Sequence, residues 1–177
     1  LSAGTVVLAL NVAPASGQEA LKEADELDQK VSKLYQAGKY AEAVPLARRA
    51  LELMEQALGP THPDVATSRN NIALCMQSLG RSAEALPKYE EALAMYQRLF
   101  LGDHPEVAMV LNNLADCLNS LGRSAEALPK FEEALAMFHR VLPAGHLYIR
   151  VTEIGLGRAL GNTGRYVEAE ALLVPAW

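Results

Sequence analysis

The sequence predicts an all-α chain built as a stack of repeated helix hairpins, and three observations lead to this fold class. First, a 42-residue unit recurs four times, and residues 79–95 match 121–137 at 16 of 17 positions, with Tyr89 exchanged for Phe131. Second, apolar residues recur at three- and four-residue spacing, while no segment alternates with a period of two. Third, a glycine stands at the same place in each unit, namely Gly38, Gly80, Gly122 and Gly164. Such self-similarity indicates a repeat array rather than one globular core.

The first element is an apolar segment that we predict lies outside the repeats. Residues 1–13 are uncharged and mostly apolar, and the small residues 14–17 precede polar ones. This pattern is typical of a secretory signal peptide, here spanning 1–17 and truncated of its basic leader, with cleavage after Ala15 or Gly17. It is too short to span a bilayer. We therefore expect export, to the periplasm or the medium of a bacterium. The alternative is a helix that packs on the first repeat of a cytoplasmic protein.

Each repeat is predicted to hold two antiparallel helices, as the third repeat illustrates. Its first helix carries one apolar stripe of Val107, Val110, Leu111, Leu114, Ala115, Leu118 and Leu121. Gly122 should end this helix, because glycine adopts the left-handed conformation without a Cβ clash. Ser124 can then cap the second helix. The apolar stripe of that helix is Ala127, Leu128, Phe131, Ala134, Leu135 and Phe138.

A start signal is repeated between units, at 61–64 and 103–106, where His-Pro is followed by an acid. Proline suits the first helical position, and the acid faces the positive end of the helix dipole. The predicted helices are 19–37, 40–57, 63–79, 82–99, 105–121, 124–141, 147–163 and 166–175. Prolines about five residues into the second helices should cause a slight bend and no break; they are Pro45, Pro87 and Pro129. The repeat domain runs over 18–177, with repeats at 19–58, 63–100, 105–142 and 147–177.

Composition narrows the function classes. The chain is 50% hydrophobic and 21% charged, which excludes a disordered polymer. Its net charge is −5 and no basic run is interleaved with aromatics, so we expect no nucleic-acid partner. Cys75 and Cys117 stand one repeat apart on equivalent helices. We expect them to be small buried side chains and not a disulfide.

Signals of catalysis, cofactors or metals are weak, and we predict none of these. Residues 155–161 echo a phosphate loop, but Gly157 aligns with the helix-packing Ala115 and no strand precedes it. His62, His104 and His146 lie in successive joints, which favours helix capping over a shared metal. We therefore expect no enzymatic activity in this region.

The repeat resembles a known family. The third repeat has the pattern Leu114-Ala115, Leu118, Gly122, Ala127, Phe131, Ala134, and the second has Ile72-Ala73, Met76, Gly80, Ala85, Tyr89, Ala92. This pattern resembles the tetratricopeptide repeat. The long period, the joining motifs at 59–66 and 102–108, and the asparagine pairs that follow them are similar to the kinesin-light-chain subclass. The end repeats depart from the pattern, since Gln29 and Lys30 replace asparagine and an apolar residue, and the fourth repeat loses the His-Pro-acid motif.

The resemblance implies a right-handed superhelical solenoid whose first helices line a concave groove for a protein or peptide partner. Opposite the apolar stripe the sequence places polar residues, and the peptide-binding candidates are Asn70, Asn71, Gln77, Asn112, Asn113, Asp116, Asn119 and Arg158. Amides donate and accept hydrogen bonds at once, which suits an extended backbone. Arg158 could pair with an acidic group of the ligand. Alternatively these side chains are simply solvated, or Asn71 and Asn113 brace neighbouring helices.

Two functions of different class follow. The first is a non-enzymatic interaction scaffold that binds a segment of a partner and has no membrane role beyond export. The alternative is the regulatory or substrate-recruiting repeat region of a larger enzyme, such as a caspase-like peptidase or a kinase, with its catalytic domain beyond Trp177. The sequence predicts neither the partner's identity nor the oligomeric state.

Overall fold

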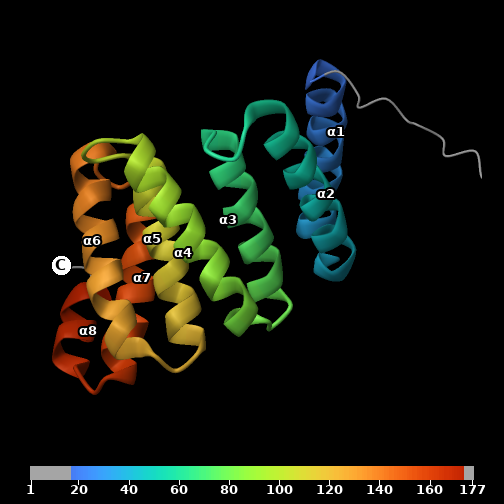
Figure 1. The fold of residues 1–177 in the computed structure, drawn as a ribbon. Helices are drawn as coiled ribbons and strands as arrows, with labels where there is room; N and C mark the ends of the chain where they lie inside the picture. Colours follow the sequence, from blue (N-terminus) through green and yellow to red (C-terminus); the bar gives the residue numbers. More distant parts are fainter. Residues whose placement is uncertain (1–16, 174–177) are drawn as a thin grey trace, which may run out of the picture.

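The computed structural model describes residues 17–173, which form eight α-helices and no strand (Figure 1). The helices are α1 (Gly17–Gln36), α2 (Tyr40–Leu58), α3 (Pro63–Ser78), α4 (Ser82–Leu99), α5 (Pro105–Ser120), α6 (Ser124–Val141), α7 (Leu147–Asn162) and α8 (Tyr166–Leu173). All the predicted helices are present, with ends shifted by at most two residues. The predicted signal peptide, apart from Gly17, and residues 174–175 of the last predicted helix lie outside the described residues.

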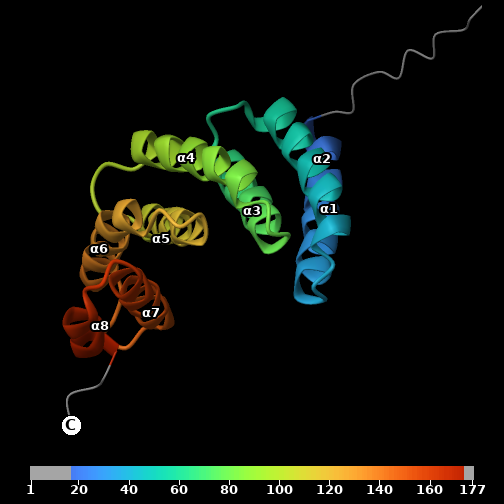
Figure 2. The same cartoon turned by 90° about the horizontal axis from the view of Figure 1, so that it is seen from below.

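The hairpins stack into an arc. Figure 2 shows α3, α5 and α7 on the inner side of the arc and α4, α6 and α8 on the outer side. Each helix packs on the next along the chain, and the inner helices α3, α5 and α7 also contact one another in order. The first helices of successive repeats therefore form one continuous inner face.

Small side chains allow the two helices of a hairpin to approach closely. Ala43, Ala85 and Ala127 are completely buried at the same place in three repeats, and Ala169 is buried in the fourth. The predicted stripe of the third repeat is confirmed, since its residues from Val107 to Leu118 are buried and Leu121 packs against the core. The core is therefore a chain of interfaces between neighbouring helices rather than one central cluster.

The turn between paired helices follows from the repeated glycine. Gly122 has φ +75°, and its N–H donates to the carbonyl of Asn119 at 3.1 Å. The N–H of Arg123 donates to the carbonyl of Leu118 at 2.9 Å. This is a Schellman closure of the first helix. It leaves so short a link that Ser124 is already helical, and Arg123 takes the N-cap position without a side-chain cap. The prediction that Ser124 caps α6 is therefore wrong.

The joints between repeats are capped by histidines, as the sequence predicted. Nδ1 of His62, His104 and His146 each accepts the backbone N–H two residues later, at 3.2–3.3 Å. The fourth repeat keeps this cap although it lacks the proline. The helices α2, α4 and α6 run unbroken through their prolines, and both cysteines are free and buried. Between residues 17 and 173, no helix is both long and apolar enough to cross a bilayer.

Candidate functional site

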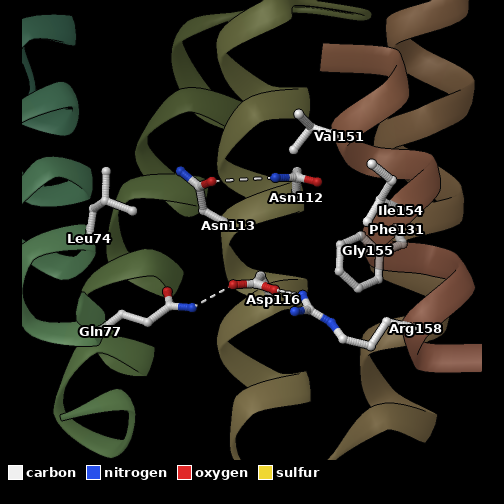
Figure 3. Close-up of a pocket in the computed structure, with 10 residues that line it drawn as sticks. All are labelled: Leu74, Gln77, Asn112, Asn113, Asp116, Phe131, Val151, Ile154, Gly155 and Arg158. Atoms are coloured by element: carbon white, nitrogen blue, oxygen red, sulfur yellow. Dashed lines mark hydrogen bonds and ion pairs between the residues drawn. The ribbon is translucent and has the colours of Figure 1, made fainter. Parts of the chain in front are cut away.

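The inner face is hollowed between the second and fourth repeats. One hollow on this face has a volume of about 370 Å³ and opens between α3, α5 and α7 (Figure 3). Its walls come from the inner helices, and its floor is the ring of Phe131 from α6. The lining residues are Leu74, Gln77, Asn112, Asn113, Asp116, Phe131, Val151, Ile154, Gly155 and Arg158.

Two smaller hollows extend this one into a groove. One of about 200 Å³ lies between α1 and α3 and is lined by Ser32, Tyr35 and Gln36 from α1. The other, of about 240 Å³, lies nearer the start of α7 and includes Met109 and Tyr148. All three hollows share Leu74. The three hollows therefore follow one another along the inner face from the first repeat to the fourth, and we call this row of hollows the groove.

A chain of polar contacts ties three repeats together along the groove. Gln77 Nε2 donates to Oδ2 of Asp116 at 2.8 Å, and the guanidinium of Arg158 pairs with Oδ1 of the same carboxylate (Figure 3). Gln77 Oε1 in turn accepts the hydroxyl of Tyr89 at 2.9 Å. Arg158 was expected to pair with an acidic group of a ligand. Its partner here is Asp116, so a ligand carboxylate would compete with an existing ion pair.

The asparagine pairs also bridge repeats. Asn113 Nδ2 donates to Oδ1 of Asn70 at 3.1 Å, and Asn70 donates to Asn71 at 3.5 Å. Asn113 thus braces α5 against α3, as one alternative from the sequence proposed. Asn70 is only 3% exposed, because its position faces the packed contact between α3 and α5. Asn70 is therefore part of the core, against expectation, but both Asn70 and the exposed Asn71 line the hollow of about 240 Å³.

Asn119 is buried as well and does not line the hollows. Its Oδ1 accepts the hydroxyl of Ser124 at 2.5 Å and the amide of Asn162 at 2.9 Å. The side chain therefore joins three helices, α5, α6 and α7. The expectation that Asn119 faces the groove is wrong because its partner comes from the next repeat, where no local pattern reveals it.

Asn112 lies in the hollow between α5 and α7. Its Nδ2 donates to Asn113 at 3.4 Å, while its Oδ1 is buried and accepts no hydrogen bond from residues 17–173. Figure 3 shows the amide between the two helices, beside Val151. A buried acceptor without a partner is costly.

The sequence analysis missed the apolar end of the groove, on α7. Leu147, Val151 and Ile154 are 68%, 45% and 54% exposed. They follow one another at helical spacing on the inner side. A signal was available, because Ile154 stands at the repeat position that asparagine occupies in α3 and α5. Large apolar side chains left on a surface in one place indicate a binding site.

Two glycines of α7 owe their identity to packing. A Cβ at Gly155 would lie 2.5 Å from the ring of Phe131, and one at Gly157 would lie 2.7 Å from Leu173. Gly155 thus replaces the asparagine of the other repeats and lets α7 approach the aromatic floor of the hollow. Close packing therefore accounts for Gly155 and Gly157, and no phosphate-binding loop is needed to explain them.

Burial keeps three titratable side chains near the groove in their neutral forms. Burial raises the pKa of the Cys117 thiol to about 11 and also raises the pKa of Cys75, so both stay protonated at neutral pH. Burial likewise raises the pKa of Tyr89, which remains a donor to Gln77. In the part of the chain that the structure describes, no three His, Cys, Asp or Glu side chains gather as metal ligands.

Comparison with known proteins agrees with this fold. The profile of the tetratricopeptide repeat matches residues 32–98, 77–140 and 106–174, which together span most of the chain. The crystal structure of BtubC (BKLC) from P. vanneervenii is 27% identical, with a TM-score of 0.75 over 85% of this chain. The chain covers only 60% of the length of that protein. No curated protein sequence matches.

Two further structures share the fold alone. The nearly identical TPR-like repeats of a kinesin light chain from Podosopora anserina are 22% identical, with a TM-score of 0.63 over 89% of this chain and 86% of that one. A TPR-like protein from Chlorobium tepidum is 21% identical, with a TM-score of 0.68 over 82% of this chain and 97% of that one. These matches confirm the predicted fold class, a right-handed superhelical solenoid of antiparallel helix hairpins.

Proposed function

This chain belongs to the tetratricopeptide repeat family, and we propose that it binds an extended segment of a partner protein along the concave groove. Repeats of this family generally mediate contacts between proteins. The observation that carries the proposal is the hollow beside α7, where Val151 and Ile154 are exposed above the ring of Phe131. Exposed apolar side chains in a hollow gain free energy when a partner's side chain covers them.

The groove offers both kinds of contact that an extended segment needs. Apolar side chains of the segment would cover Leu74, Val151 and Ile154. Its backbone N–H groups would donate to the side-chain amide of exposed Asn71. Affinity would then come mainly from apolar burial, and orientation from the amides.

The groove is also held in shape before a partner arrives. The contacts Gln77–Asp116–Arg158 and Asn113–Asn70 link α3, α5 and α7. Rigid walls reduce the ordering cost of association, so a short segment can bind with useful affinity.

The proposal is tested with a displayed library of random peptides, each about twelve residues long, roughly the length that spans the groove. Binders are titrated against the wild type, Val151→Glu and the matched control Val167→Glu, since Val167 is 81% exposed on α8 and outside the groove. We expect Val151→Glu to weaken binding roughly tenfold or more, because the carboxylate would have to be desolvated. A library without binders, or equal affinity of the two variants, would refute the proposal.

A further inference from the structure

The two ends of the groove differ in chemical character. At the α7 end, Val151 and Ile154 are apolar and exposed. At the α1 end, the equivalent positions in the repeat hold Asp25 and Asp28. Figure 2 shows α1 and α7 at opposite ends of the arc. A segment that runs along the groove therefore meets an apolar surface first and a negative one last.

The two aspartates share the inner face of α1. Asp28 lies four residues before Ser32 and Asp25 lies seven before it, and Ser32 lines the hollow between α1 and α3. Helical residues three, four or seven apart lie on one side of a helix. The matching positions of α5, Met109 and Asn112, line the groove in the same way.

The charge of these aspartates is not neutralised within residues 17–173. Neither carboxylate makes an ion pair there, whereas Asp116 in the middle of the groove pairs with Arg158. Asp28 is half-buried, and burial, followed by the nearby charge of Asp25, raises its pKa. Lys22, three residues before Asp25, is exposed and makes no ion pair with either aspartate among residues 17–173. A cation that reaches the aspartates from outside would therefore be attracted.

We propose that the segment bound in the groove carries apolar side chains over α7 and a lysine or arginine over α1. This inference rests on the proposed function and adds the chemical class of the ligand and the spacing of its side chains. The first helices of adjacent repeats lie about 8–10 Å apart, so three steps span about 24–30 Å. The basic residue should therefore stand roughly seven to nine residues from the apolar ones in an extended segment.

The same geometry disfavours an acidic segment. A ligand carboxylate at the α1 end would face Asp25 and Asp28, and like charges in a partly buried place repel strongly. In the middle of the groove, Arg158 is occupied by Asp116. We therefore expect bound peptides to carry a positively charged side chain at the α1 end and apolar side chains at the α7 end.

The test uses the same displayed peptide library and the full-length chain. Sequences of the selected peptides are compared with the unselected library, and the best binder is titrated against wild type, Asp25→Asn/Asp28→Asn and Lys22→Gln. The matched control is Glu132→Gln/Glu133→Gln, which removes two charges from the outer helix α6. We expect enrichment of lysine or arginine at the stated spacing and a roughly fivefold or greater loss of affinity in the aspartate variant alone. High salt should weaken wild-type binding and leave the aspartate variant less affected.

The outcomes separate this inference from the proposed function. If peptides bind and Val151→Glu abolishes binding, but no basic residue is enriched or the aspartate variant binds like wild type, the groove is correct and the inference is wrong. Enrichment of acidic residues would also overturn it. A library that yields no binder contradicts both proposals.

Discussion

The inner helices α5 and α7 hold equivalent places in successive repeats, yet α5 presents polar side chains to the groove and α7 presents apolar ones. At matching positions α5 carries Asn112 and Asn113, whereas α7 carries Ile154 and Gly155. The outer helices do not differ in this way, since α4 and α6 are almost identical in sequence. Packing between helices thus fixes the outer members, and the groove face is where this chain differentiates its repeats. The proposed binding function rests on those differences.

A second contrast concerns the aromatic residue behind the groove. Tyr89 and Phe131 are equivalent and both are buried. Tyr89 donates its hydroxyl to Gln77 at 2.9 Å, whereas Phe131 has no hydroxyl and lies under Gly155. In the second repeat the aromatic residue is therefore held by a hydrogen bond, whereas in the third repeat the ring of Phe131 is left as an apolar floor for the hollow.

The largest effect is expected when the asparagine of α5 is transferred to α7. Gly155→Asn would place a Cβ 2.5 Å from the buried ring of Phe131, and we expect overpacking to lower the free energy of unfolding by about 3 kcal/mol. The control is Gly161→Ala, where an added Cβ meets nothing within 4 Å. Chemical denaturation measures both. Equal stabilities would show that α7 does not approach Phe131 closely.

Ala127→Leu tests the close approach of paired helices, which every repeat shares. Ala127 is completely buried, so the larger side chain should cost roughly 2 kcal/mol in unfolding free energy. Ala125→Leu, at an exposed position on the same helix, is the control. A thermal melt that is unchanged in Ala127→Leu would mean that the pairing of α5 with α6 is wrong.

Tyr89→Phe makes the second repeat resemble the third. It leaves Gln77 Oε1 without its donor, and we expect a loss of about 1 kcal/mol in unfolding free energy. Tyr89→Phe with Gln77→Asn, the pair found in the third repeat as Phe131 and Asn119, provides a coupling measurement. If the single variant loses nothing, the hydroxyl does not contribute to the link between repeats.

The smallest effect concerns the joints, where the repeats agree. His104 caps α5 through Nδ1, and its ring stacks on Phe100 with centroids 3.6 Å apart. His104→Ala should cost about 1 kcal/mol, and His104→Asn less, because asparagine can also cap a helix. Urea titration compares the two. Asparagine performing no better than alanine would contradict the capping role.

Nearly all of the fold could be predicted from the sequence, because the 42-residue period and the glycines act locally. Ser124 is the exception among the helix ends, since the Schellman turn before it leaves no room for a separate cap. The candidate site was predicted only in part. Gln77, Asn112, Asn113, Asp116 and Arg158 do line the hollow.

The remaining site residues depended on contacts between repeats. Asn70 and Asn119 are buried because Asn113 and Asn162, one repeat further along the chain, cover them. A single helix pattern contains no information about those partners. The apolar end at α7 could have been predicted, because Ile154 departs from the asparagine found at the same position of the other two repeats. The prediction instead followed the asparagines that those repeats share.

The most direct test of the groove is a map of where a partner segment lies. A peptide selected from the library is made with a photoreactive side chain at its apolar anchor, cross-linked to the intact chain, and the attached residues are identified by mass spectrometry. We predict attachment to the inner face of α5 and α7, at Asn112, Val151 or Ile154. Attachment confined to the outer helices α4 and α6 would contradict the groove as the binding site.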